Sequence, residues 1–261
     1  MIDKLSLEKI KKHIENPLPV YFYECTGSTN AVAADLADNG APHGTSVFAR
    51  HQTAGKGRLG RSFVSPDDSG IYMSIVLKPD DFNPVLITTA AAVAVCRAIE
   101  KICGCNPQIK WVNDIYLEGK KVCGILAEAV TDHKTSQITH IILGIGINCR
   151  NDAIPPELKN IAGAVEGNYS INHLAAEVLN QVISLVSDPQ ADRFINEYKT
   201  RSIVIGKTVT VHKGGLIPGK PGVPARVLDI DNTGGLVVIY TSGQRETLST
   251  GEISIRLQSG E

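Results

Sequence analysis

The character of the chain changes near residue 206, and this change limits the possible folds more than any other feature of the sequence. Beyond it lie five short β-rich segments within about fifty residues, at 208–212, 225–230, 236–240, 245–248 and 253–257. Glycine-containing turns at 232–235 and 241–243 are typical of β-hairpins. Closely spaced short strands of this kind predict a small β-barrel. We therefore expect a domain boundary at 202–206, with one domain over residues 1–203 and a second over 204–261.

The first part of the chain mixes strand and helix patterns. Strands are predicted at 20–24, 45–50, 71–78, 108–111 and 138–149, with a hairpin over 115–130 that turns at 118–120. Helical patterns mark residues 5–14, 28–36, 84–103, 171–186 and 191–199. The chain has 261 residues, enough for one medium domain and a small appendage. The predicted class is α+β, a mixed β-sheet with helices packed on it.

Composition argues against several classes of protein. The formal net charge is −1, so no bulk field would hold the chain on nucleic acid or on an anionic membrane. The six cysteines form no paired framework, and the C-x-C at Cys103 and Cys105 lacks a second cluster that would complete a metal site. No apolar signal core and no stretch of ~20 apolar residues appears. We expect a soluble cytoplasmic protein with free thiols.

A glycine-rich basic loop occupies residues 52–63. Three glycines allow the backbone to approach a ligand closely, and Lys56, Arg58 and Arg61 add positive charge at the same place. Such a loop suits a phosphate or a developing phosphoanhydride. The alternative is a solvated surface loop with scattered charges.

Three known nucleotide motifs resemble parts of the chain but do not fit it. Gly55-x-Gly57-x-x-Gly60 spells the dinucleotide fingerprint, yet residues 65–70 follow too soon for the helix that this motif requires. A protein-kinase glycine loop is excluded because no H-R-D or D-F-G element follows. The segment 206–208 resembles the end of a P-loop, but Arg201 stands where the first glycine is needed.

Three further patches carry polar residues beside predicted strands. Asn113 and Asp114 follow a strand in KWVNDIY, where a simple turn is the plainer interpretation. Lys121 opens the apolar strand KVCGILAE, where an edge lysine is the default. Two glycines interrupt the strand GIGIN, which indicates either close approach of a ligand or a bulge.

Taken together, Ser28-Thr29-Asn30, Gln52 with GKGRLG, KWVNDIY, KVCGILAE and GIGIN resemble the biotin protein ligase family. The patches follow the family order over about residues 23–257. The resemblance implies a catalytic domain of the class II synthetase-like, biotin–lipoate ligase type and a C-terminal Src-homology-3-like barrel. Only about twenty residues precede the first core strand, so we expect the monofunctional type without an N-terminal DNA-binding domain.

The family's reaction would then be the reaction of this chain. ATP and biotin form biotinyl-5′-AMP with the help of Mg²⁺, and the biotinyl group passes to a specific lysine of a biotin carboxyl carrier protein. Because water would destroy the acyl-adenylate, we predict that residues 51–65 are mobile without ligand and ordered with it. The strand at 138–147 would allow a homodimer by edge pairing, since relatives dimerise.

The resemblance also implies roles for individual residues. The catalytic residues would be Arg58 and Lys121, which offset the anionic charge at the reacting centre. Biotin would be bound by Ser28, Thr29, Asn30, Gln52, Lys56, Gly57, Arg58 and Lys121. The nucleotide would be bound by Gly55, Lys56, Gly57, Arg58, Phe63, Asn113, Asp114 and Asn148.

Within these sets, Phe63 would stack on the adenine, where relatives often carry Trp, and Asp114 would help to bind Mg²⁺. The chain departs from the common loop pattern at Leu59 and at Lys56, where arginine is usual and its planar fork is lost.

Three other functions remain open at this point. A lipoate or octanoate ligase shares the adenylate chemistry, although the GKGRLG loop and the barrel favour biotin. A non-catalytic biotin-binding or DNA-binding regulator would need an extra DNA-reading module or a basic face. A plain nucleotide-binding domain would turn over neither acid.

Overall fold

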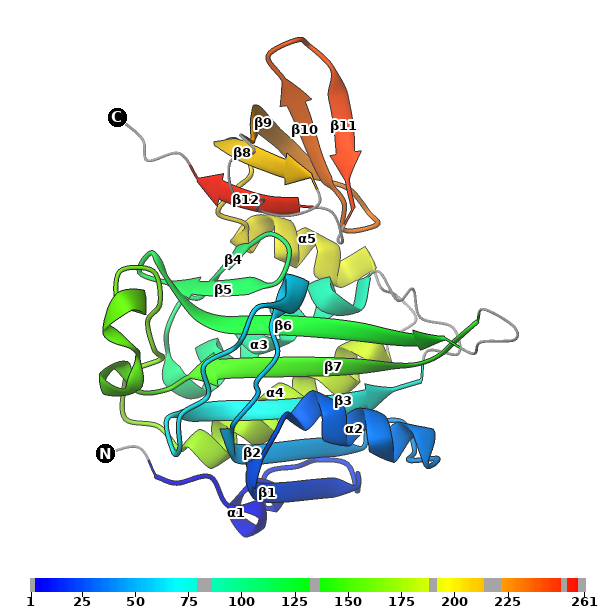
Figure 1. Cartoon of the computed structure of the whole chain (residues 1–261), viewed down its shortest axis with the longest axis vertical. Coiled ribbons are helices and arrows are strands. Elements are labelled where there is room, and N and C mark those ends of the chain that lie inside the picture. Colours follow the sequence, from blue (N-terminus) through cyan, green and yellow to red (C-terminus); the bar gives the residue numbers. More distant parts are fainter. Residues whose placement is uncertain are drawn as a thin grey trace.

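A seven-stranded mixed sheet forms the centre of the molecule (Figure 1). The computed structural model describes residues 3–78, 86–131, 137–187, 192–213, 222–249 and 253–257. The strand order is β1-β2-β3-β7-β6-β5-β4, with β1 parallel to β2 and the other neighbours antiparallel. The strands are β1 (Val20–Thr26), β2 (Ser46–Gln52), β3 (Gly70–Leu77), β4 (Gln108–Lys110), β5 (Asp114–Leu117), β6 (Lys120–Thr131) and β7 (Ile138–Asn148).

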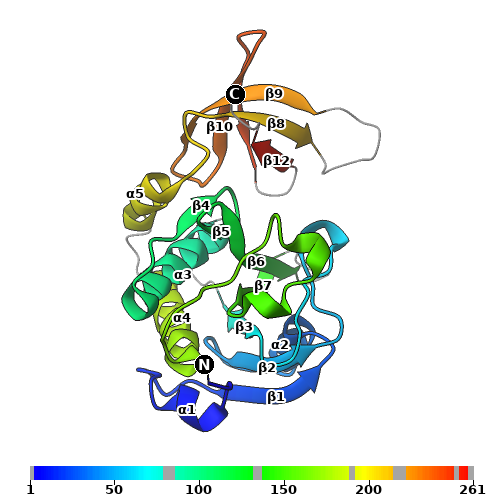
Figure 2. The ribbon, with the colours of Figure 1, turned by 90° about the vertical axis from the view of Figure 1, so that its left-hand side faces the viewer.

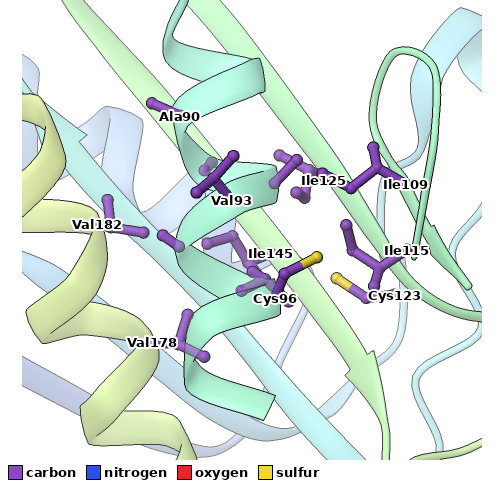
Figure 3. Close-up of a cluster of buried hydrophobic side chains, with 14 of the residues drawn as sticks. Ala90, Val93, Cys96, Ile109, Ile115, Cys123, Ile125, Ile145, Val178 and Val182 are labelled. Atoms are coloured by element: carbon purple, nitrogen blue, oxygen red, sulfur yellow. The ribbon is translucent and has the colours of Figure 1, made fainter. Parts of the chain in front are cut away.

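Helices cover the two faces of this sheet unequally (Figure 2). The helices α3 (Ile87–Cys103) and α4 (Ile171–Val186) pack on one face, and α2 (Thr29–Asp38) packs on the other. Figure 3 shows Val93 and Cys96 of α3 between Ile145 of the sheet and the α4 residues Val178 and Val182. The small side chains of α3 let it lie close to both neighbours, so the main core is on this side.

Strand β7 shows how the two faces differ. Its odd-numbered residues, from Ile141 to Ile147, belong to the main core, whereas Ile142 belongs to the smaller cluster under α2. Because side chains alternate along a strand, Gly144 and Gly146 lie on the α2 face with Ile142. That face therefore has a stretch of sheet without side chains, next to the N-terminal end of α2.

Three more elements complete the described fold. The short helix α1 (Leu7–Lys11) lies against α4, and α5 (Asp192–Arg201) leads toward a second sheet. That sheet is five-stranded, antiparallel between the strands that pair, and ordered β11-β10-β9-β8-β12. Its strands are β8 (Thr208–Lys213), β9 (Val223–Ile230), β10 (Leu236–Tyr240), β11 (Arg245–Leu248) and β12 (Ile253–Leu257).

The predicted α+β class, with a mixed sheet and a small C-terminal β-unit, is confirmed by this arrangement. Most predicted elements occur within a few residues of their expected bounds. The helix predicted at 84–103 begins at Ile87, and residues 84 and 85, like residue 191, lie outside the described residues. The predicted boundary between residues 203 and 204 falls in the segment that joins α5 to β8 and stays a prediction.

Two expectations need correction. The helix expected over 5–14 covers only Leu7–Lys11, because the Asn180 side chain accepts from the backbone N–H of Glu15 and donates to the carbonyl of His13. The strand at 138–147 is not an edge, since β7 lies between β3 and β6. Edge pairing through it is therefore wrong as a route to a homodimer, and the homodimer itself stays a prediction.

Candidate active site

The glycine-rich loop folds back on itself as a short hairpin over the α2 face of the sheet. Gly57 N–H donates to the Arg61 carbonyl at 2.7 Å, and Phe63 N–H donates to the Gly55 carbonyl at 2.8 Å. A single 3₁₀ turn, Arg58–Gly60, forms the tip, where Leu59 has φ 56° and Gly60 has φ 72°. No helix opens at the third glycine, so the dinucleotide interpretation is excluded here by geometry as well as by spacing.

Two adjoining cavities lie beneath this loop. The larger has a volume of about 680 Å³, and the smaller has a volume of about 50 Å³. They share five lining residues: Gly57, Arg58, Phe63, Asn113 and Lys121. A ligand in one cavity would therefore meet a ligand in the other beside Arg58 and Lys121.

The smaller cavity gathers every residue that the sequence predicts for biotin. Ser28, Thr29 and Asn30 at the start of α2 are all buried. Gln52, at the end of β2, accepts through Oε1 from the backbone N–H of Thr29 at 2.8 Å. Its Nε2 donates to Ser65 Oγ at 2.9 Å. The remaining predicted residues, Lys56, Gly57, Arg58 and Lys121, line the same cavity.

Charged groups converge where the cavities meet. Arg58 Nη1 donates to Asn113 Oδ1 at 3.0 Å, and Lys121 Nζ lies 2.7 Å from Asp114 Oδ1. Burial lowers the pKa of Arg58, and the Asp114 carboxylate opposes that shift. Since arginine stays charged in proteins, the place where the cavities meet holds two cationic side chains and one carboxylate.

Strand pairing explains how Asn113 and Lys121 reach this place. Asn113 stands at the turn between β4 and β5, and its Nδ2 donates to the Ile125 carbonyl of β6 at 2.8 Å. Lys121, near the start of β6, exchanges backbone hydrogen bonds with Ile161 and Gly163. These bonds also bring the segment 153–162 to the cavity as a wall.

The predicted nucleotide residues divide between the two cavities. Asn113, Asp114 and Asn148 line the larger cavity, and Lys56 lines only the smaller one. Gly55 lines neither, because its Cα faces the Phe63 carbonyl and Ser65 inside the loop. Sequence reasoning missed several residues of the larger wall, which are Trp111, Tyr116, Arg150 and the apolar residues Ile154 and Ile161. Trp111 and Tyr116 could have been predicted, since both belong to the KWVNDIY patch that also contains Asn113 and Asp114.

Phe63 lies on the bare stretch of sheet between the cavities. A Cβ built on Gly146 would be 2.5 Å from its ring, and one built on Gly124 would be 3.2 Å away. Its ring also meets the Tyr72 ring edge-on, with centroids 6.4 Å apart. The ring is thus close to both cavities, and only glycines leave room for it there.

The described part of the chain contains no group of three or more His, Cys, Asp or Glu that could hold a metal by itself. Among the residues that the structure describes, Asp114 is the one carboxylate that lines either cavity. A single carboxylate fits Mg²⁺ only where substrate phosphates supply further oxygen ligands. Among the described helices, none is long and apolar enough to cross a membrane.

Comparison with known proteins links these features to one family. The model of the biotin/lipoate A/B protein ligase family matches residues 22–148, which include both cavities' β-strand residues. The bifunctional ligase/repressor BirA of Escherichia coli is 32% identical over 222 residues, covering 82% of this chain and 67% of that protein. The bifunctional ligase/repressor BirA of Bacillus spizizenii is 44% identical over 146 residues, covering 54% of this chain but only 44% of that protein.

A solved structure shares the fold over almost the whole chain. The biotin protein ligase from Aquifex aeolicus, in complex with biotin and ATP, superposes with a TM-score of 0.76 at 26% identity. The match covers 92% of this chain and 99% of that one.

Proposed function

The chain belongs to the biotin protein ligases of the biotin/lipoate A/B protein ligase family, and on this premise we propose that it activates biotin with ATP and transfers it to a lysine of a carrier protein. One observation carries the proposal: two cavities of different size meet at Arg58 and Lys121. Biotin would occupy the smaller cavity with its carboxylate where the two cavities meet. ATP would occupy the larger one with its α-phosphate at the same place.

The first step is adenylation of biotin. A carboxylate oxygen of biotin attacks the α-phosphorus, the bond from that phosphorus to the bridging oxygen of the β-phosphate breaks, and pyrophosphate leaves. The carboxylate and the triphosphate repel each other, so Arg58 and Lys121 would act by offsetting the negative charge between them. Asn113 would hold Arg58 in place through its Oδ1.

The second step is acyl transfer. The neutral ε-amine of the carrier lysine attacks the acyl carbon, the bond to the AMP oxygen breaks, AMP leaves, and the amine loses a proton. The mixed anhydride must be kept from water until the amine arrives. The hairpin loop, which contributes Arg58, Leu59 and Phe63 to the cavity lining, is suited to cover it.

The carrier would be a biotin carboxyl carrier protein or domain, the acceptor that the resemblance to the family implies. Asp114 would hold Mg²⁺, which would supply neutralisation of the negative charge of ATP. We place the enzyme in the cytoplasm, a proposal supported by six free cysteines in the described chain.

Acid-dependent exchange between ATP and labelled pyrophosphate tests the proposal. We expect exchange with biotin but not with lipoate or octanoate, and a loss of about a hundredfold or more in Lys121→Ala. The variant Lys12→Ala, in which an exposed lysine far from both cavities is removed, is the control and should exchange like the wild type.

The other outcomes separate the remaining functions. Exchange with lipoate or octanoate in place of biotin would move the chain to a neighbouring ligase group. Absence of exchange with all three acids would contradict adenylation and leave a binding module.

A further inference from the structure

Glu128, on β6, contacts both the wall of the smaller cavity and the loop, and the sequence analysis assigned no role to it. Its Oε2 accepts from Asn30 Nδ2 at 2.6 Å, and its Oε1 lies 3.9 Å from Lys56 Nζ. The Glu128 side chain is 41% exposed, so it is neither a buried structural acid nor a freely solvated one. Glu128 thus contacts one residue predicted to bind biotin and one cation of the hairpin loop.

The sheet places Glu128 on the face that carries the site. Gly124, Leu126 and Glu128 alternate along β6 and pair with Gly146, Gly144 and Ile142 of β7. On the far side of β7, Gly144 pairs with Ser74 of β3. Ser74 and Glu128 therefore approach the Asn30 amide from two different strands, across a glycine.

A carboxylate only accepts hydrogen bonds, and this fixes the direction of the bonds around it. The NH₂ group of Asn30 must face Glu128, so its Oδ1 must face Ser74 Oγ, 2.5 Å away. Ser74 has one proton and gives it to Asn30. Thr29 Oγ1, 2.7 Å from Ser74 Oγ, gives its own proton to Gln52 Oε1 at 3.1 Å.

Without Glu128, nothing forces one direction on the bond between Asn30 and Ser74. The Asn30 amide can turn over, and Ser74 can donate to Thr29 Oγ1 in place of Asn30 Oδ1. The two orientations present opposite patterns of donors and acceptors to the cavity. A ureido ring, which has one carbonyl acceptor and two N–H donors, fits only one fixed pattern.

We propose that Glu128 is a positioning residue for biotin: it sets the hydrogen-bond direction of Asn30 and Ser74, and it links them to the loop through Lys56. The inference rests on the proposed function and deepens it by naming what selects the ureido ring. Partial burial of a carboxylate beside the apolar cluster under α2 costs free energy unless it is hydrogen-bonded. The bond to Asn30 offsets that cost.

Binding of biotin and of iminobiotin, measured by titration calorimetry, tests the proposal. Iminobiotin carries a guanidino nitrogen donor in place of the ureido carbonyl, so a fixed pattern should discriminate between the two. In Glu128→Ala we expect biotin to bind about tenfold more weakly, with a smaller loss for iminobiotin, so that the ratio of the two affinities falls. Glu128→Gln keeps an oxygen that accepts from Asn30, and it should restore most of the ratio.

The control is Glu166→Ala, which removes an exposed glutamate that lines neither cavity, and it should leave both affinities unchanged. An unchanged ratio in Glu128→Ala would overturn the inference, and so would a Glu128→Gln variant as impaired as Glu128→Ala. Both results leave the proposed function standing, because the wild type would still bind biotin. A wild type that binds no biotin would instead contradict the proposed function, and the inference with it.

Discussion

Gly144 and Gly146 show how much of the site depends on positions where the chain has no side chain. A Cβ at Gly144 would meet the Asn30 amide, with Cγ at 3.0 Å, and a Cβ at Gly146 would meet the Phe63 ring. Larger residues at these positions would fill the floor of the smaller cavity. The two glycines therefore make room for the Asn30 and Phe63 side chains, at a cost to the strand, in which glycine is normally unfavourable.

Gly146→Ala tests this at the scale of one methyl group. The new Cβ would lie 2.5 Å from the ring of Phe63, and the ring belongs to a loop that can shift. We expect the free energy of unfolding to fall by only about 1 kcal/mol, but biotin-dependent pyrophosphate exchange to fall about tenfold or more. Urea unfolding and the exchange assay measure the two effects.

Gly27→Ala is the matched control, because a Cβ there meets no atom within 4 Å. It should leave exchange at the level of the wild type. A Gly146→Ala enzyme with full exchange would mean that no ligand approaches the floor at this glycine.

Among the elements, the hairpin loop is held to the sheet by few bonds. Its tip is exposed at Leu59, 52% of whose surface is accessible, and it carries the trypsin sites Lys56, Arg58 and Arg61. We expect trypsin to cleave the ligand-free chain in this loop, and biotin with ATP to slow that cleavage about tenfold, as an ordered loop covers the intermediate. The rate is read by mass spectrometry of the fragments.

Biotin alone and ATP alone serve as the comparison for that experiment. Cleavage at Lys9 and Lys11 in α1, which lie outside both cavities, should proceed at the same rate with and without ligands. Equal cleavage of the loop in every condition would contradict ordering by the ligand.

The anchor of α1 on α4 is a second element with a testable response. His13 stacks on His173 with ring centroids 4.2 Å apart. Burial and the neighbouring His13 lower the pKa of His173, while Glu177 opposes the shift and Lys101 adds to it. The folded chain thus binds this proton less readily than the unfolded chain, whose histidines titrate near 6.5.

The sign of the pH effect follows from that difference. The stabilising contribution is complete above pH ~6.5 and is lost as the pH falls through the lowered pKa of His173. We expect hydrogen-exchange protection factors in α1 to be lower at pH 5.5 than at pH 7.5. His173→Gln, which cannot be protonated, should remove the difference, and a pH response that survives in this variant would assign the effect to another group.

Sequence patterns predicted elements far better than they predicted how elements meet. Alternation and periodicity located β7 and α3 because both signals are local. The same patterns do not contain the strand order, so the prediction of an edge strand at 138–147 is wrong, and β7 is central. The role of Glu128 was missed for a related reason. Its spacing from Gly124 along β6 predicts that the two residues lie on the same face of the sheet, but its partner Asn30 is 98 residues away along the chain.

At the scale of the whole molecule, one apolar cluster runs through both sheets. Buried residues of the second sheet, among them Val209, Val227 and Leu236, belong to the same cluster as α3 and β7. Trp111 connects the seven-stranded sheet to the second sheet, since its Nε1 donates to the Gly234 carbonyl at 2.8 Å. We call this contact between the two sheets the junction. Tyr198 of α5 supports it by donating to the Val112 carbonyl at 3.0 Å. The two parts are therefore expected to unfold together.

Trp111 allows this to be measured without any added probe, because it is the only tryptophan in the chain. Its fluorescence in urea reports the junction, and far-UV ellipticity reports all helices and strands. If the junction belongs to one cooperative unit, the two transitions coincide within error. Two separate midpoints would show that the C-terminal sheet opens before the seven-stranded sheet unfolds.

Substitutions at the junction carry this last prediction further. Trp111→Phe leaves the buried Gly234 carbonyl without its donor, which should cost about 1–3 kcal/mol of unfolding free energy by ellipticity. Lys199→Ala removes only the surface ion pair to Asp229, whose side chain is 52% exposed, and it should cost less than about 1 kcal/mol of unfolding free energy.

Trp111 also lines the larger cavity, so ATP should shift its fluorescence emission. If Trp111 both stabilises the contact between the sheets and lines the ATP site, ATP should raise the urea midpoints of fluorescence and of ellipticity together. A rise in only one of the two midpoints would contradict this link between ATP binding and the contact between the sheets.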